Sequence, residues 1–163
     1  MNILMSYMAN QKRNRFLNKH LENLTLAFEL AKINLGSTNE NPSVGCVVEK
    51  DGSIISSGYT SVRWRPHAEF NALKKKINFK SSNIYITLEP CSHYGKTPPC
   101  TDIIKNKGIK KVYYSIDDYD IRSKNKSKIA LSKKNIITNK YFLKKKGLKF
   151  YESYYLSLIH ISE

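Results

Sequence analysis

The sequence is poor in acidic residues, in cysteine and in long apolar stretches. Its 13 Asp and Glu are outnumbered by 28 Lys and Arg, which gives a formal net charge of +15 over 163 residues. Three cysteines are too few for a disulfide-rich secreted domain, and in a reducing compartment they point to metal binding or catalysis. No apolar run reaches the ~18–20 residues of a transmembrane helix. No export signal is recognisable at the N-terminus, so we expect a cytoplasmic protein with no membrane partner.

The composition is that of one globular domain. Hydrophobic residues make up 40% of the chain and aromatic residues 11%, and the length is sufficient for a buried core. The positive charge has two interpretations, nucleic-acid binding or a bias toward A/T-rich codons. Lys, Ile and Asn are all abundant, and the lysines are scattered, with their longest runs at 74–76 and 144–146. We favour the compositional bias and do not expect a nucleic-acid partner.

Apolar spacing and turn residues predict alternating helices and strands. The predicted helices cover 16–35, 67–77, 100–107, 127–133 and 142–155, and the predicted strands cover 44–49, 53–59, 83–88, 110–116 and 136–137. This order indicates a three-layer α/β/α domain around a central mixed sheet of about five strands. Residues 1–15 look like an irregular N-terminal tail, and the domain itself is expected over 16–150. Residues 156–163, with His160, depart from the Lys- and Asn-rich style, so we expect 151–163 to be a truncated and partly artefactual C-terminal end.

Three short segments carry candidate chemistry. His67 and Glu69 open one predicted helix, Cys91 follows a proline after a predicted strand, and Cys100 opens the next helix. A set of two cysteines and one histidine leaves the fourth tetrahedral position of Zn²⁺ open to water, as in catalytic zinc sites. Glu69 can face the same pocket without binding the metal and can act as general acid and base. Each residue alone would be ordinary, but together they form the signature of zinc nucleobase deaminases. The third cysteine, Cys46, is interpreted as a core residue.

The segments 41–48, 66–69 and 87–100 closely resemble a known family. They are similar to the deaminase domain of the bacterial bifunctional enzymes of riboflavin biosynthesis, the diaminohydroxyphosphoribosylaminopyrimidine deaminase / 5-amino-6-(5-phosphoribosylamino)uracil reductases. The resemblance spans about residues 18–150. Its most specific part is the spacer of eight residues between Cys91 and Cys100, because tRNA adenosine deaminases and cytidine deaminases usually place these cysteines as Cys-x-x-Cys.

The resemblance implies a cytidine-deaminase-like fold and a hydrolytic deaminase. Its substrate would be 2,5-diamino-6-(5-phosphoribosylamino)pyrimidin-4(3H)-one, a phosphorylated small molecule. His67, Cys91 and Cys100 would bind Zn²⁺, and Glu69 would shuttle the proton. The implied substrate contacts are Asn41, His93, Lys96, Asp118 and Asp120. In these roles the amide of Asn41 suits the pyrimidine, since it offers a donor and an acceptor, and Lys96 would lie on the side of the ribose phosphate.

The chain departs from the family pattern in three places. The family's Asp-Pro-Asn-Pro corresponds to residues 118–121 here, so Asp120 replaces an amide with a carboxylate. If that carboxylate faces the substrate phosphate, we expect it to repel the phosphate and Asp120→Asn to improve binding. If it bonds only to ribose hydroxyl groups, we expect the replacement of the amide to cost little. Thr60 stands in place of a family histidine and Trp64 in place of a glycine.

The chain ends where the family's reductase domain would begin, so that domain is expected to be absent. The intact protein is expected to form homo-oligomers. Two alternatives stay open. One is a deaminase of bases in tRNA or another nucleic acid, and the other is a non-catalytic fragment that only binds zinc.

Overall fold

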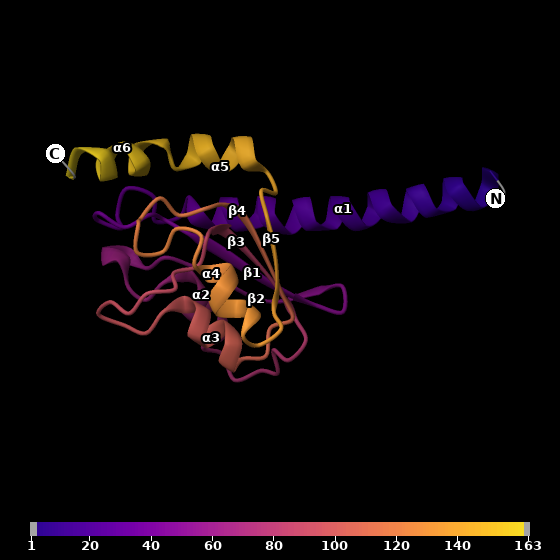
Figure 1. Ribbon diagram of the computed structural model, residues 1–163, viewed down its shortest axis with the longest axis horizontal. Helices are drawn as coiled ribbons and strands as arrows, with labels where there is room; N and C mark the ends of the chain where they lie inside the picture. The colour runs from indigo at the N-terminus through magenta and orange to yellow at the C-terminus, as the bar shows by residue number, and fades with distance from the viewer. Residues whose placement is uncertain (1–2, 162–163) are drawn as a thin grey trace.

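A single mixed sheet forms the centre of the fold. The computed structural model describes residues 3–161 without the side chains of Trp64, His160 and Ile161, so the expectations about Trp64, His160 and the outermost tail residues lie outside the described residues. The strands lie in the order β2-β1-β3-β4-β5 (Figure 1). They are β1 (Gly45–Lys50), β2 (Ser53–Tyr59), β3 (Asn83–Leu88), β4 (Lys111–Ile116) and β5 (Ile137–Lys140). β1 runs antiparallel to β2 and β3, whereas β3, β4 and β5 are parallel, which confirms the predicted mixed sheet.

Helices cover both faces of this sheet. α1 (Ile3–Ala31) and α5 (Lys144–Phe150) lie on one side, and α2 (Ala68–Leu73), α3 (Cys100–Asn106) and α4 (Ser127–Ser132) lie on the other (Figure 1). α6 (Glu152–Ile161) follows α5 on the first side, and a short 3₁₀ helix, η1 (Val62–Trp64), precedes α2. The predicted three-layer α/β/α architecture is therefore confirmed.

Close contact between α1 and the sheet fixes the position at which β1 begins. Leu24, Ala27 and Phe28 of α1 are completely buried and recur at helical spacing. Gly45 faces them, and a Cβ atom at this position would overlap the backbone carbonyl of Ala27. Only glycine allows this approach, and it brings the segment before β1, including Asn41, into a fixed position relative to α1.

The first helix begins earlier than the sequence indicated. α1 starts at Ile3, so the prediction of an irregular tail over residues 1–15 was wrong for its described part. Side chains 3–18 are exposed, which explains why they show no apolar period. Once the buried end of the helix is packed, each added turn gains backbone hydrogen bonds without a new nucleation cost.

The C-terminal end divides into two helices where one was predicted. Tyr151, between α5 and α6, is 2% exposed and belongs to the core. A chain of hydrogen bonds runs from the Gly45 N–H to the Thr87 hydroxyl, on to the Tyr151 hydroxyl and from there to the Ser43 carbonyl, over 3.1, 2.6 and 2.9 Å. The domain therefore extends beyond the predicted boundary at residue 150.

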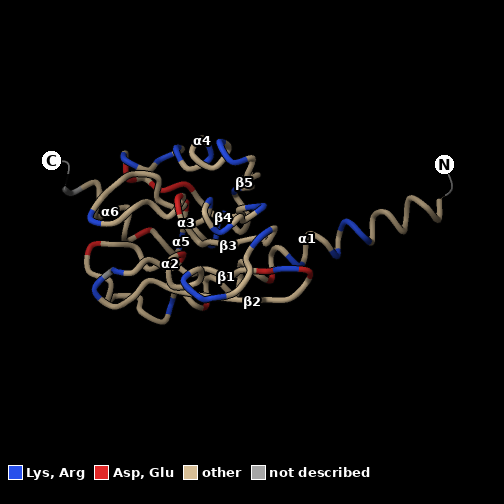
Figure 2. Tube along the Cα trace, turned by 90° about the horizontal axis from the view of Figure 1, so that it is seen from below, with Lys and Arg blue, Asp and Glu red and all other residues tan. Residues whose placement is uncertain are grey.

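Basic residues are distributed over several parts of the fold. Figure 2 shows Lys and Arg on α1, around α4 and in loops at both ends of the sheet. They do not form a single continuous stripe in this view, which agrees with a compositional origin of the charge. No helix within residues 3–161 combines the length and the apolar character needed to cross a membrane.

Candidate active site

The N-terminus of α2 carries two of the predicted residues. His67 caps the helix with an extended backbone, at φ −67° and ψ 162°, and Glu69 lies in the first turn. Ala68 and Ala72 are fully buried and hold α2 against β1 and β2. Because α2 is fixed in this way, the side chains of His67 and Glu69 line the same cavity.

The two predicted cysteine ligands come from opposite ends of one loop. Cys91 follows β3, and Cys100 is the first residue of α3. The Cys100 N–H donates to the Cys91 sulfur at 3.2 Å, and the Cys91 carbonyl accepts from the Thr101 N–H at 3.1 Å. The free N–H groups of a helix start favour negative charge, so this environment suits a thiolate.

The three side chains fit a zinc ion. The ligand atoms of His67, Cys91 and Cys100 all lie within 4.8 Å of one another. His67 Nδ1 is 3.3 Å from Cys100 Sγ and 3.8 Å from Cys91 Sγ. Nitrogen and sulfur ligands of tetrahedral zinc lie about 3.5–3.8 Å apart, given their bond lengths. The predicted donor set is therefore brought close to the spacing of zinc ligands, and three protein ligands would leave the fourth tetrahedral position to water.

Electrostatics separate the roles of Cys91 and Glu69. Hydrogen bonding from Cys100 lowers the pKa of Cys91 to about 4, with His67 adding to the effect. Glu69 is 4% exposed, and burial together with the nearby Cys91 charge raises the pKa of its carboxyl group. Cys91 is thus prepared to bind metal as a thiolate, whereas Glu69 has a raised affinity for a proton.

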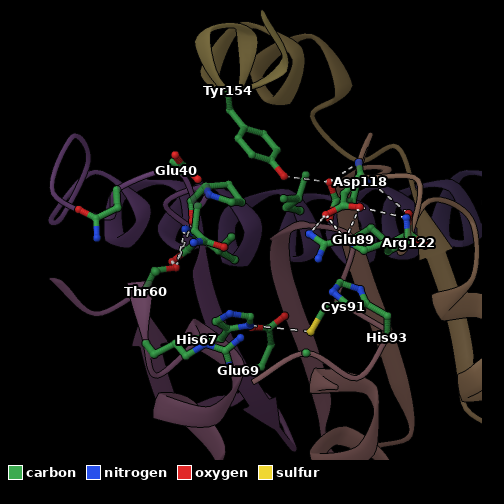
Figure 3. Close-up of a pocket in the computed structure, with 18 of the residues that line it drawn as sticks. Glu40, Thr60, His67, Glu69, Glu89, Cys91, His93, Asp118, Arg122 and Tyr154 are labelled. Atoms are coloured by element: carbon green, nitrogen blue, oxygen red, sulfur yellow. Dashed lines mark hydrogen bonds and ion pairs between the residues drawn. The ribbon is translucent and has the colours of Figure 1, made fainter. Parts of the chain in front are cut away.

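A cavity of about 920 Å³ opens above the triad. His67, Glu69 and Cys91 lie at one end of it, and Asp118, Arg122 and Tyr154 lie at the other (Figure 3). Cys100 is buried behind this end. The structure also places every predicted substrate contact in the wall of the cavity: Asn41, His93, Lys96, Asp118 and Asp120.

Glu89 is a cavity residue that the sequence analysis did not identify. Its buried carboxylate accepts hydrogen bonds from the backbone N–H groups of Asp118, Asn125 and Ser127, at 3.0, 3.1 and 3.2 Å. The Ser127 hydroxyl adds a fourth bond at 2.7 Å. One side chain therefore fixes the whole loop between β4 and α4. The signals in the sequence were an acidic residue at the end of a buried strand and its place within segment 87–100, which resembles the family.

Asp118 is buried and faces the cavity. Burial raises the pKa of its carboxyl group to about 7. The Tyr154 hydroxyl donates to Asp118 Oδ1 at 3.4 Å, and the Asp120 N–H donates to the same oxygen at 3.0 Å. Tyr154 belongs to α6, within the C-terminal end 151–163 that was expected to be partly artefactual, so the cavity wall includes part of that end.

Asp120 has a partner that changes the expectation of phosphate repulsion. Arg122 Nε lies 2.9 and 3.0 Å from the two Asp120 oxygens, and Arg122 Nη2 lies 2.5 Å from Oδ2. These bonds hold the pKa of the Asp120 carboxyl group below its usual range. The carboxylate is therefore compensated by a guanidinium group at the edge of the same cavity.

Thr60 supports the opposite wall. Its side chain is 2% exposed, and its Oγ1 accepts a hydrogen bond from the Val44 N–H at 2.9 Å. The Thr60 N–H donates in turn to the Val44 carbonyl at 2.9 Å. Thr60 thereby braces the segment that follows Asn41.

The comparisons with known proteins agree with this geometry. Residues 17–116 match the family described as "Cytidine and deoxycytidylate deaminase zinc-binding region". The chain is 38% identical over 133 residues to the "Diaminohydroxyphosphoribosylamino-pyrimidine deaminase" of Buchnera aphidicola, covering 81% of this chain and 90% of that protein. It is 46% identical over 99 residues to the "Riboflavin biosynthesis protein RibD" of Actinobacillus pleuropneumoniae, covering 60% of this chain but 26% of that protein.

Solved structures give the same result. A diaminohydroxyphosphoribosylaminopyrimidine deaminase / 5-amino-6-(5-phosphoribosylamino)uracil reductase from Thermotoga maritima superposes with a TM-score of 0.78 at 37% identity, covering 83% of this chain and 40% of that one. RibD of Acinetobacter baumannii gives a TM-score of 0.80 at 33% identity, covering 85% of this chain and 39% of that one.

The chain therefore belongs to the cytidine and deoxycytidylate deaminase zinc-binding family. Within it, the chain belongs with the diaminohydroxyphosphoribosylaminopyrimidine deaminases. It spans about a quarter of the length of the longer RibD relatives.

Proposed function

We propose that this chain catalyses the hydrolytic deamination of 2,5-diamino-6-(5-phosphoribosylamino)pyrimidin-4(3H)-one. The products are 5-amino-6-(5-phosphoribosylamino)uracil and ammonia. The observation that carries the proposal is the buried Glu69 carboxyl group beside the zinc-compatible triad, in one cavity with the substrate contacts. The name of the Buchnera relative, of which the chain covers 90%, supports the choice of substrate.

The reaction requires one group that both accepts and donates a proton. Water forms a bond to the ring carbon, the bond to the amino nitrogen breaks, and the proton removed from water reaches the leaving nitrogen. Glu69 can accept this proton and return it, and its raised pKa brings it closer to working pH, where such catalysis is most effective. Zinc held by His67, Cys91 and Cys100 would supply a Lewis acid that lowers the pKa of water.

The remaining cavity residues bind and orient the substrate. Asn41 offers both a donor and an acceptor to the edge of the pyrimidine ring. Lys96 lies on an exposed loop and would contribute positive charge on the side of the ribose phosphate. Asp118 and Tyr154 contact each other in the wall of the same cavity, where they can meet ribose hydroxyl groups.

Ammonia release from the phosphorylated diaminopyrimidine by zinc-loaded protein tests this proposal. Wild-type protein should release one ammonia per product formed, and Glu69→Gln should retain zinc but lose most of the rate. A fully zinc-loaded wild-type protein that releases no ammonia would overturn the proposal. In a parallel reaction, ammonia from single-stranded RNA alone would favour the nucleic-acid alternative, and ammonia from neither would favour the non-catalytic one.

A further inference from the structure

Arg122 lies at the open edge of the cavity. It lies in the loop between β4 and α4, at the end of the cavity away from His67 and Glu69 (Figure 3). Its side chain is 66% exposed, whereas that of its partner Asp120 is 14% exposed. The carboxylate is thus directed inward and the guanidinium group lies at the open edge.

Asp120 holds one edge of this guanidinium group. The Arg122 Nε and Nη2 atoms donate to the carboxylate, which also accepts from the Arg122 backbone N–H at 3.0 Å. None of these bonds uses Nη1. An arginine held in this way presents its other edge in a fixed direction, and that edge has the geometry to bind a phosphate through two parallel hydrogen bonds.

The loop beneath Arg122 is fixed at several points. Glu89 binds the backbone on both sides of it, at Asp118 and at Asn125. The Ser123 hydroxyl forms a hydrogen bond with His93 Nδ1 at 2.8 Å, which joins this loop to the one that carries Lys96. Because the backbone is restrained, binding a ligand to Arg122 costs little ordering entropy.

The charges of the cavity are compatible with an anion at Arg122. Arg65 and Lys96 add positive charge to the cavity as a whole, since both line it. Among the carboxylates, Asp120 is paired, Glu89 accepts four hydrogen bonds from the loop, and Glu40 lies on the opposite side in the view of Figure 3. Burial raises the pKa of Asp118 to about 7, so this group is partly protonated at neutral pH.

We propose that Arg122, positioned by Asp120, binds the phosphate group of the substrate. This inference rests on the proposed function, in which the leaving amine is on ring carbon 2 and the phosphate is attached through ribose to the amino group on carbon 6. With the amine at the zinc end, the phosphate extends toward the other end of the cavity, where Arg122 lies. Asp120 acts as a positioning residue and has no direct contact with the phosphate.

Arg122→Gln tests the inference through the separation of KM from kcat. The variant should raise KM for the phosphorylated substrate about 10- to 100-fold, the usual range for losing a charge-assisted hydrogen bond. Its kcat should stay within about threefold, because the reacting atoms are at the other end. For the substrate without its phosphate, KM should be the same in wild-type protein and variant. Equal losses with both substrates would overturn the inference.

Three further variants separate specific binding by Arg122 from an effect of general charge. Lys124→Gln removes one positive charge from the same loop, at an exposed position that does not line the cavity, and should leave KM unchanged. Asp120→Asn should raise KM about three- to tenfold, and the double variant Asp120→Asn/Arg122→Gln should be no worse than Arg122→Gln alone. Additive losses in the double variant would show that Asp120 does not act through Arg122.

A binding measurement distinguishes failure of this inference from failure of the proposed function. Ribose 5-phosphate should bind to zinc-loaded wild-type protein in calorimetry, and should bind at least about tenfold more weakly to Arg122→Gln. This result would support the phosphate site even if no ammonia were released. Normal deamination by a variant that still binds ribose 5-phosphate fully would reject Arg122 and leave the proposed function intact.

Discussion

The backbone N–H of Cys100 donates to the sulfur of Cys91 over 3.2 Å, so the start of α3 supports the thiolate that follows β3. This contact joins the two ends of the eight-residue spacer at the metal site. The long spacer therefore does not separate the ligands, and the loop between them is free to extend along the cavity, where it carries His93 and Lys96.

Cys91→Ser should abolish tight zinc binding. Removing a direct ligand should weaken affinity by more than about 100-fold, since loss of an outer partner alone costs ~10–100-fold. Chelator competition and elemental analysis measure this. Cys46→Ala is the matched control, because Cys46 is buried in β1 and is not part of the triad. Equal zinc content in both variants would contradict the assignment.

Glu69→Gln should lower the deamination rate by about 10²–10⁴-fold while zinc content stays at the wild-type level. Glutamine keeps the size of the side chain but cannot carry the proton between water and the leaving amine. Steady-state ammonia assays and metal analysis of the same preparation provide the test. A rate close to that of wild type would show that Glu69 serves only the structure of α2.

The Tyr151→Phe variant should be less stable by about 1–3 kcal/mol in free energy of unfolding. The change removes the hydroxyl that links Thr87 to the Ser43 carbonyl and leaves buried polar groups without that partner. Urea unfolding measures the effect. Tyr119→Phe, at a side chain that is 49% exposed, should change stability by less than about 0.5 kcal/mol. Similar values for both variants would mean that the Tyr151 network is unimportant.

Asp118 should make the protein less stable as the pH rises. Its folded pKa of about 7 lies above the ordinary value near 3.9, so between these values the unfolded chain releases a proton that the folded chain retains. The free energy of unfolding therefore falls with rising pH in this range. Asp118→Asn should remove about 2–3 kcal/mol of this decline between pH 5 and pH 8.

Urea unfolding at the two pH values, compared between wild type and variant, isolates the contribution of Asp118. Asp51→Asn is the matched control, because it makes the same chemical change at an exposed position outside the cavity. An identical decline in Asp118→Asn would show that the buried carboxyl group is ionised throughout the range.

The sequence by itself determined the strands and the metal ligands. Residues 53–59 and 83–88 form strands with the bounds that their pattern predicted. A strand of this kind can be recognised from consecutive residues alone, because its signal is an alternating or continuous run of apolar side chains. The zinc ligands His67, Cys91 and Cys100 could also be predicted from the sequence. Metal chemistry restricts the residue types, and each ligand lies near a predicted helix start or strand end.

Only the tertiary structure decided what surrounds that centre. Glu89 binds a loop that begins 29 residues later in the chain, and Tyr154 contacts Asp118 from a distance of 36 residues. Such contacts leave no period in the sequence, since they depend on how α4 and α6 pack against the ends of the strands. Asp120 and Arg122 are near neighbours, yet a local pattern could not show that their side chains pair or that the pair faces the cavity. The charge at that end of the cavity is set by the folding of the loop around the buried Glu89 carboxylate.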